Sequence, residues 1–295
     1  MPTNTERDRP SNPLELTRRD FVRVAVGTGF AVAVMPVGAQ TIKTSSEGLS
    51  VGEVTIRVGD FRMPAYRAAP SGRSGKSADL PVVLVVSEIF GVHEYIADVA
   101  RRFAKLGYLA IAPELFVRQG DAQSYGEVGK LMAEVVAKVP DAQVMGDLDA
   151  TVAWAKANGG DTSKLGITGF CWGGRVTWLY TAHNPSIKAG VAWYGQLSGQ
   201  PNALKPTNPI DRVGQLNAPV LGLYGAEDSG IPLAAVDRMK AALATGNASA
   251  KASQFIVYPG ASHAFHADYR PSYQQDAAED GWKRCVAWFK ANGVA

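Results

Sequence analysis

The chain has 295 residues, of which 46% are hydrophobic and 19% charged, and its formal net charge is +3. This length allows one large domain or two small ones, and the composition excludes a disordered chain and one embedded throughout in a membrane. The charges are mixed, with no basic run interleaved with aromatic residues, so nothing indicates nucleic-acid binding. Two cysteines are too few for a disulfide framework.

The first 39 residues have the order of an export signal. Arg18 and Arg19 precede an apolar stretch over 24–37, and Ala39 closes a run of small residues that a signal peptidase could recognise. The apolar stretch has about 14 residues, fewer than the roughly 20 of a membrane-spanning helix. Because paired arginines are typical of twin-arginine signals, we expect residues 1–39 to engage the twin-arginine export machinery. The protein would then be periplasmic or secreted in a bacterium, without stable membrane insertion after processing. The alternative is an amphipathic or disordered tail with a chance pair of arginines.

Residues 40–50 are rich in serine and threonine and predict a linker, so the expected domain covers residues 51–295. Its first expected elements are a hairpin of strands 54–58 and 61–67, strand 82–86, a helix ending before Gly107, and strand 108–112. A helix at 128–139 follows, then a helix through 144–152 that ends at Gly159-Gly160, and strand 164–169 with a helix after it. The last elements are strand 189–195, a long loop at 196–211, strand 220–224, helix 233–243, strand 255–258 and helix 277–290. Strands alternating with helices predict an α/β fold with a mostly parallel sheet covered by helices on both faces.

A G-x-C-x-G sequence stands where strand 164–169 meets the following helix. It is the nucleophile-elbow pattern with sulfur in place of the hydroxyl, and Gly169 and Gly173 allow the close approach that a sharp turn at Cys171 needs. Backbone N–H groups at a helix N-terminus favour a thiolate there. The alternative is a buried cysteine in a glycine-rich turn. Cys285, in contrast, is spaced with aromatic residues as on the buried stripe of a helix, which predicts a packing role.

Four chemically active side chains follow predicted strands. They are Glu88, Cys171, Asp228 and His263. Chemistry in open α/β sheets gathers at the carboxyl ends of the strands, so we expect these side chains to meet at one edge. The order nucleophile, acid, base is that of α/β-hydrolases.

These residue types predict acyl transfer. Cys171 would attack an acyl carbon, His263 would carry protons, and Asp228 would hold the imidazole in one tautomer. The backbone N–H groups of Ile89 and Trp172 would bind the oxyanion. Glu227 competes with Asp228 for the acid role, and His266 competes with His263. No clustered metal ligands and no G-x-G-x-x-G after a strand are present in the sequence, so we expect neither a metal nor another cofactor.

Several segments together resemble the dienelactone hydrolase (carboxymethylenebutenolidase) family. They are residues 87–91, 112–115, 169–174, 194–195, 225–228 with Ile231-Pro232, and 258–265, and the resemblance extends from about residue 51 to the C-terminus. It implies a triad of Cys171, His263 and Asp228, the last in preference to Glu227. It also implies that Glu88 lies beside the thiol and helps convert it to thiolate when substrate binds.

The chain departs from the family where a substrate carboxylate would be held. An arginine is expected four residues after the histidine, and the sequence has Ala267 there. Arg118 and Arg270 are the remaining candidates, and Tyr194 and Phe265 are further candidates for substrate binding. Fold and reaction class therefore carry over from the resemblance, whereas dienelactone itself as substrate does not.

The sequence predicts a hydrolase that cleaves a small-molecule lactone or activated ester through a cysteinyl thioester. A thiolate leaves a tetrahedral adduct readily, so the substrate needs a comparably good leaving group, such as an enolate. Two alternatives remain. One is a non-catalytic or redox-responsive protein that uses Cys171, and the other is a hydrolase of another acyl class, such as a thioesterase.

Overall fold

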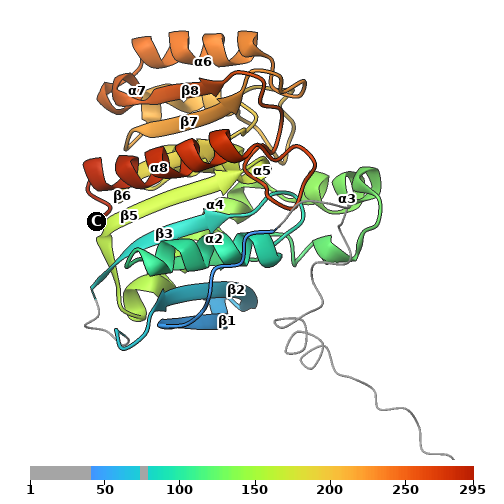
Figure 1. Ribbon diagram of the computed structural model, residues 1–295. Coiled ribbons are helices and arrows are strands. Elements are labelled where there is room, and N and C mark those ends of the chain that lie inside the picture. Colours follow the sequence, from blue (N-terminus) through green and yellow to red (C-terminus); the bar gives the residue numbers. More distant parts are fainter. Residues whose placement is uncertain (1–40, 74–78) are drawn as a thin grey trace, which may run out of the picture. The chain divides into compact units, whose positions relative to one another are not determined.

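A single eight-stranded sheet, in the order β1-β2-β4-β3-β5-β6-β7-β8, runs through the molecule (Figure 1). The computed structural model describes residues 41–73 and 79–295, so the expected signal peptide at 1–39 lies outside the described residues. The strands are β1 (Leu49–Val58), β2 (Phe61–Pro70), β3 (Leu80–Val86), β4 (Leu109–Pro113), β5 (Gly160–Phe170), β6 (Ile187–Trp193), β7 (Val220–Gly225) and β8 (Gln254–Tyr258). The pairings β1–β2 and β2–β4 are antiparallel, and all those from β4 to β8 are parallel.

Helices cover both faces of the sheet, as the alternation of strands and helices predicts (Figure 1). The α-helices are α2 (Glu94–Lys105), α3 (Val128–Glu134), α4 (Asp141–Ala157), α5 (Trp172–His183), α6 (Leu233–Thr245), α7 (Ala248–Ala252) and α8 (Gln275–Ala291). Short 3₁₀ turns occupy Ala122–Ser124, Val136–Lys138 and Pro209–Gln215. Among the described residues, none of the helices is both long enough and apolar enough to cross a membrane.

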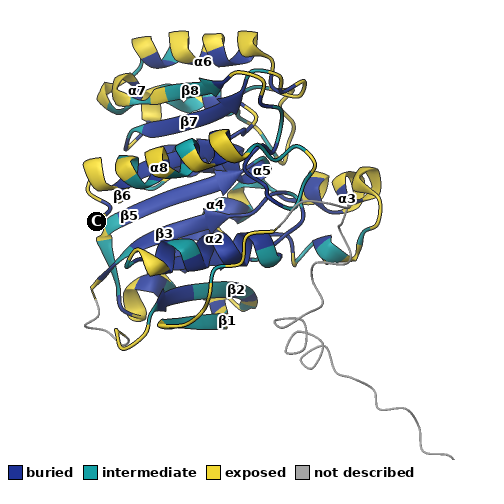
Figure 2. Ribbon diagram, viewed as in Figure 1, coloured by how far each residue is buried: buried dark blue, intermediate teal, exposed yellow. Residues whose placement is uncertain are grey.

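The side chains of β3 show how the two faces are divided. Successive residues of a strand point to opposite sides of a sheet. Val83 and Val85 belong to the core beneath α2 and α8, whereas Val82 and Val86 belong to the core beneath α4 and α5. All four are fully buried. The continuous apolar run in the sequence therefore follows from a strand that is covered on both faces, and Figure 2 shows the buried strands between helices whose outer faces are exposed.

The expected strands and helices are present, several of them with bounds that differ by a few residues, such as β1, β2 and β6. β5 is longer than expected because it begins at Gly160, which was expected to end the preceding helix. The helix expected over 128–139 ends at Glu134, because the backbone of Val135 leaves the helical region with φ −120° and ψ −68°. The short helix α7 (Ala248–Ala252), capped by the Asn247 side chain, was not expected. None of these differences moves a predicted site residue away from its strand end.

The segment predicted as a linker at 40–50 is held against the domain over most of its length. The Thr44 N–H donates to Asp98 on α2 at 2.5 Å, and the Ile42 N–H donates to Asp268 at 3.2 Å. From Leu49 onward the chain is part of β1. Backbone hydrogen bonds to two buried carboxylates fix this segment, and serine and threonine content alone does not reveal them.

Candidate active site

The backbone at Cys171 adopts φ +55° and ψ −114°, a strained conformation for a residue with a side chain. It joins the end of β5 to the first turn of α5. A Cβ atom on Gly169 would lie 2.2 Å from the carbonyl oxygen of Gly173, and one on Gly173 would lie 2.4 Å from that of Val86. Neither position has room for a side chain. This is the tight turn that the G-x-C-x-G pattern predicts, and it exposes the sulfur at the N-terminus of α5.

Two backbone N–H groups border the elbow without an intramolecular acceptor. Neither the N–H of Trp172 nor that of Ile89 donates a hydrogen bond to any residue that the structure describes. Trp172 begins α5, and Ile89 follows β3, whose last residue approaches Gly173 closely. Unpaired donors on both sides of a nucleophile are the arrangement that an oxyanion requires.

Asp228 and His263 are joined by a hydrogen bond of 2.7 Å between Oδ2 and Nδ1. Asp228 is 3% exposed, and its Oδ1 accepts the N–H groups of Gly230 at 2.9 Å and Ile231 at 3.2 Å. The carboxylate is therefore fixed by its own loop and presents a single oxygen to the imidazole. Glu227, the competing acid, is exposed and makes no such bond among the described residues.

The His263 imidazole interacts with both Asp228 and Cys171. Burial lowers its pKa, but hydrogen bonds with Asp228 and then Cys171, together with their negative charges, raise the pKa to about 10. The imidazole side chain is 38% exposed, so solvent screens part of this effect. The direction of the shift nevertheless favours the protonated imidazole.

His266 has a different environment, although it lies only three residues after His263. It is 2% exposed, and its Nδ1 is 2.6 Å from the Tyr95 hydroxyl. Burial, and then the charge of Arg102, lowers its pKa well below the usual value, which keeps the ring neutral. The structure therefore brings His263, and not the competing His266, to the carboxylate of Asp228.

Glu88 lies in the interior at the end of β3 and is 1% exposed. Its Oε2 accepts the Tyr269 hydroxyl at 2.5 Å and is 3.5 Å from Nε2 of His93. Burial raises its pKa, but His93, Tyr269 and the charge of Arg270 lower it below the usual value overall, so the group is a carboxylate. Its Oε1 has no partner among the described residues. No pattern in the sequence predicts that Tyr269 or His93 lies beside Glu88, because both contacts depend on how distant loops pack.

Arg118 does not join the predicted site as a free cation. Its guanidinium binds Asp147 through two hydrogen bonds of 2.6 and 2.7 Å and lies 4.0 Å from the centre of the Phe61 ring. The interpretation of Arg118 as a substrate-binding residue is therefore corrected, since a bidentate partner already satisfies the group. Arg270, by contrast, lies over Phe90 at 5.3 Å.

Tyr194 and Phe265 are fully buried beside the triad. The Tyr194 ring packs edge-on against His263 at 5.1 Å and against Phe265 at 5.3 Å. Tyr194 has a left-handed backbone with φ +39°, and its hydroxyl has no hydrogen-bond partner in the part of the chain that the structure describes. Phe265 thus supports the ring of Tyr194 from the core, whereas Tyr194 brings an unpaired hydroxyl close to the site.

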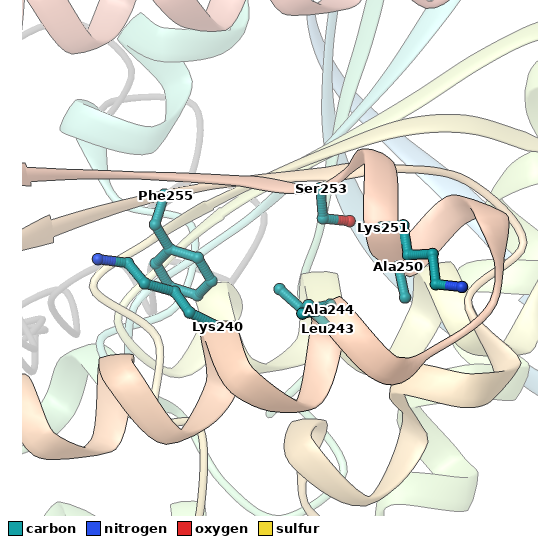
Figure 3. A pocket seen from close by; sticks show the side chains of 7 residues that line it. All are labelled: Lys240, Leu243, Ala244, Ala250, Lys251, Ser253 and Phe255. Carbon is teal, nitrogen blue, oxygen red and sulfur yellow. The ribbon is translucent and has the colours of Figure 1, made fainter.

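Two cavities lie away from Cys171. One of about 220 Å³ is bordered by α6, α7 and β8, with Lys240, Lys251 and Phe255 among its lining residues (Figure 3). The other, of about 330 Å³, is lined by His266, Arg102 and Trp282 among others. Cys171, Asp228 and His263 are not among the residues that line either cavity.

Known proteins resemble this chain over most of its length. The model of the dienelactone hydrolase family matches residues 63–293. A protein of Methylorubrum extorquens named "Putative carboxymethylenebutenolidase" is 58% identical over 95% of this chain and 94% of its own length, and one of Escherichia coli with the same name is 52% identical over 90% and 96%. The crystal structure of a "Putative Dienelactone Hydrolase" from Klebsiella pneumoniae superimposes with a TM-score of 0.79 and 54% identity, covering 82% of this chain and 98% of the other. The chain therefore belongs to the dienelactone hydrolase family, and it is a hydrolase of carboxylic esters or lactones with the α/β-hydrolase fold.

Proposed function

We propose that the protein cleaves a lactone or an activated carboxylic ester through a thioester on Cys171. The single observation that carries this proposal is the His263 imidazole, hydrogen-bonded to Asp228 and interacting with the Cys171 thiol at a strained elbow. The nucleophilic form of cysteine is the thiolate, and a neighbouring imidazolium stabilises that form.

The reaction proceeds in two halves. The Cys171 thiolate attacks the substrate carbonyl carbon, and the oxyanion that forms accepts hydrogen bonds from the N–H groups of Ile89 and Trp172. The C–O bond of the ester then breaks, and His263 gives its proton to the departing oxygen. In the second half a water attacks the thioester, His263 accepts the water's proton, and the thiolate leaves with the acid as product.

The choice of sulfur restricts the substrate. Collapse of the first tetrahedral adduct expels whichever group leaves more easily, and a thiolate leaves well. Enol lactones and aryl esters have leaving groups good enough to compete with it, and His263 assists by protonating them. This chemistry disfavours ordinary amides.

We predict that Cys171→Ala and His263→Ala abolish hydrolysis of an aryl ester while the far-UV circular dichroism stays that of the wild type. The wild-type protein, stopped early in turnover, should gain the mass of the acyl group on Cys171. Cys285→Ala is the matched control, because Cys285 is the other free cysteine, is fully buried, and should leave activity intact. Full turnover by Cys171→Ala would contradict the proposal. Rapid oxidation of Cys171 by peroxide, without any acyl adduct, would instead favour the redox-responsive alternative.

The pH dependence of Cys171 alkylation tests the ion pair independently of turnover. Because the folded-state pKa of His263 is raised from 6.5 to about 10, the imidazolium persists through neutral pH and is lost only as the pH rises through about 10. We expect the rate of iodoacetamide alkylation to be level around neutral pH and to change in the alkaline range. Asp228→Asn removes the carboxylate that raises this pKa and should move the alkaline transition toward neutral pH. If the alkylation rate of Asp228→Asn changes at the same pH as that of the wild type, Asp228 is not the cause of the raised pKa of His263.

We propose that Arg270 recognises a carboxylate on the substrate. It is the partly exposed arginine whose charge reaches Glu88, whereas Arg118 is bound to Asp147 and Ala267 is buried. Arg270→Ala should raise the KM of a carboxylate-bearing lactone about tenfold, as expected for the loss of one charge-assisted contact, and leave that of an uncharged aryl ester unchanged. Arg238→Ala, an exposed arginine on α6, is the control. Equal KM changes for both substrates would exclude charge recognition.

We also propose that residues 1–39 direct export through the twin-arginine machinery. The bound segment that begins near Ile42 supports this, since cleavage after Ala39 would leave those contacts in the mature protein. Replacing Arg18 and Arg19 together by lysine should retain the full-length precursor in the cytoplasm, as measured by cell fractionation and immunoblotting. Arg23→Lys should be processed normally. Normal processing of the paired lysine variant would rule out the twin-arginine route.

A further inference from the structure

The loop between β8 and α8 carries both His263 and His266 but turns them toward different partners. Between them Ala264 has φ +62°, a left-handed backbone that bends the chain sharply. His263 meets Asp228, whereas His266 turns into the interior and is almost fully buried. A polar ring buried in a core needs a hydrogen-bond partner and close packing, and here residues next to the elbow provide the packing.

The His266 ring contacts Phe170, the residue before Cys171, and Trp193, the residue before Tyr194. Its ring stacks on Phe170, which precedes Cys171, with centroids 5.3 Å apart and planes 27° apart. It also lies 4.4 Å from the ring of Trp193, whose carbonyl oxygen accepts the Cys171 N–H at 3.0 Å. A displacement of His266 would therefore change the position of its loop relative to the strands that carry the thiol.

The hydrogen bond with Tyr95 fixes the orientation of His266. Burial raises the pKa of Tyr95 well above its ordinary value, so the phenol keeps its proton, and His266 is neutral. The hydrogen bond therefore joins a protonated phenol to Nδ1 of a neutral ring. Tyr95 itself packs edge-on against Phe170 at 5.5 Å. The bond thus links α2, the elbow and the histidine loop at one buried point.

We propose that Tyr95 and His266 are positioning residues that hold His263 in register with Cys171. The inference rests on the proposed function and adds to it the contacts that position the base, His263. Asp228 fixes Nδ1 of His263, but the approach of the opposite ring nitrogen to the sulfur depends on where the loop backbone lies. His266, three residues away, sets that backbone against the elbow. Neither positioning residue takes part in proton transfer or contacts substrate.

A second attachment allows this role to be tested without loss of the fold. Asp268, on the same loop, accepts hydrogen bonds from Arg102 at 3.0 Å and from the Ile42 N–H at 3.2 Å. These bonds remain when the Tyr95 hydroxyl is removed. Tyr95→Phe should therefore leave the loop attached but free to shift by a fraction of an ångström around its turn.

The test compares Tyr95→Phe with Tyr108→Phe. Tyr108 is also buried in the same core, but its hydroxyl has no hydrogen-bond partner among the described residues. We expect Tyr95→Phe to lower kcat for an aryl ester about 10- to 100-fold, the loss typical of a small misplacement of a catalytic group, with KM changed less than about twofold. The alkaline transition of Cys171 alkylation should shift to lower pH because His263 contacts the thiolate less closely. Tyr108→Phe should change neither quantity.

Two variants of His266 complete the test. His266→Gln retains an acceptor for the Tyr95 hydroxyl and should keep more of kcat than His266→Leu, which has none. If Tyr95→Phe and His266→Leu both keep the wild-type kcat and alkylation profile while Cys171→Ala is inactive, the positioning role is wrong and the proposed function stands. If Cys171→Ala turns the ester over, the proposed function fails, and the positioning role fails with it.

Discussion

The left-handed backbone at Cys171 is the constraint on which the rest of the site depends. A residue with a side chain adopts φ +55° only where its surroundings enforce it. Here backbone packs directly against backbone. Gly169 lies against the carbonyl of Gly173, and Gly173 lies against the carbonyl of Val86, so neither glycine has room for a side chain. This contact places the end of β3, which Ile89 follows closely, beside the first turn of α5, which begins at Trp172. The geometry of the proposed oxyanion site is thus a consequence of the turn that exposes the nucleophile.

A buried ionic cluster provides the second constraint, on the side of the histidine. Asp98 and Asp268 are nearly inaccessible, and Arg102 binds both, at 2.6 and 3.0 Å. Buried ion pairs contribute little net stability, since desolvation offsets their attraction. Their effect here is geometric. Each carboxylate also accepts a backbone N–H from the segment at 42–44, so α2, the histidine loop and the start of the domain are attached at one point. Loss of either acid would leave Arg102 with only one of its two carboxylate partners and would release one of the two backbone N–H groups.

Local patterns in the sequence predicted the sheet, both helical layers and the strand ends that carry Cys171, Asp228 and His263. These features depend on apolar runs, on glycine spacing and on the order of residues along the chain. Contacts between distant segments were not predictable in this way. One example is the pair of Arg118 and Asp147, which engages an arginine that the sequence offered as a substrate ligand. Another is the hydrogen bond between Tyr269 and Glu88, which are 181 residues apart in the chain. Such pairings depend on loop packing, for which one sequence carries no periodic signal.

The state of Glu88 bears on how the thiol is activated. The family resemblance implies a glutamate that converts the thiol to thiolate when substrate binds. In this chain the carboxylate accepts the Tyr269 hydroxyl and lies 3.5 Å from Nε2 of His93, and the pKa of His263 is raised through Asp228 and Cys171. The hydrogen bond between Glu88 and Tyr269 also attaches the loop that carries Arg270. Substrate recognition and the position of that loop would then be linked through the same carboxylate.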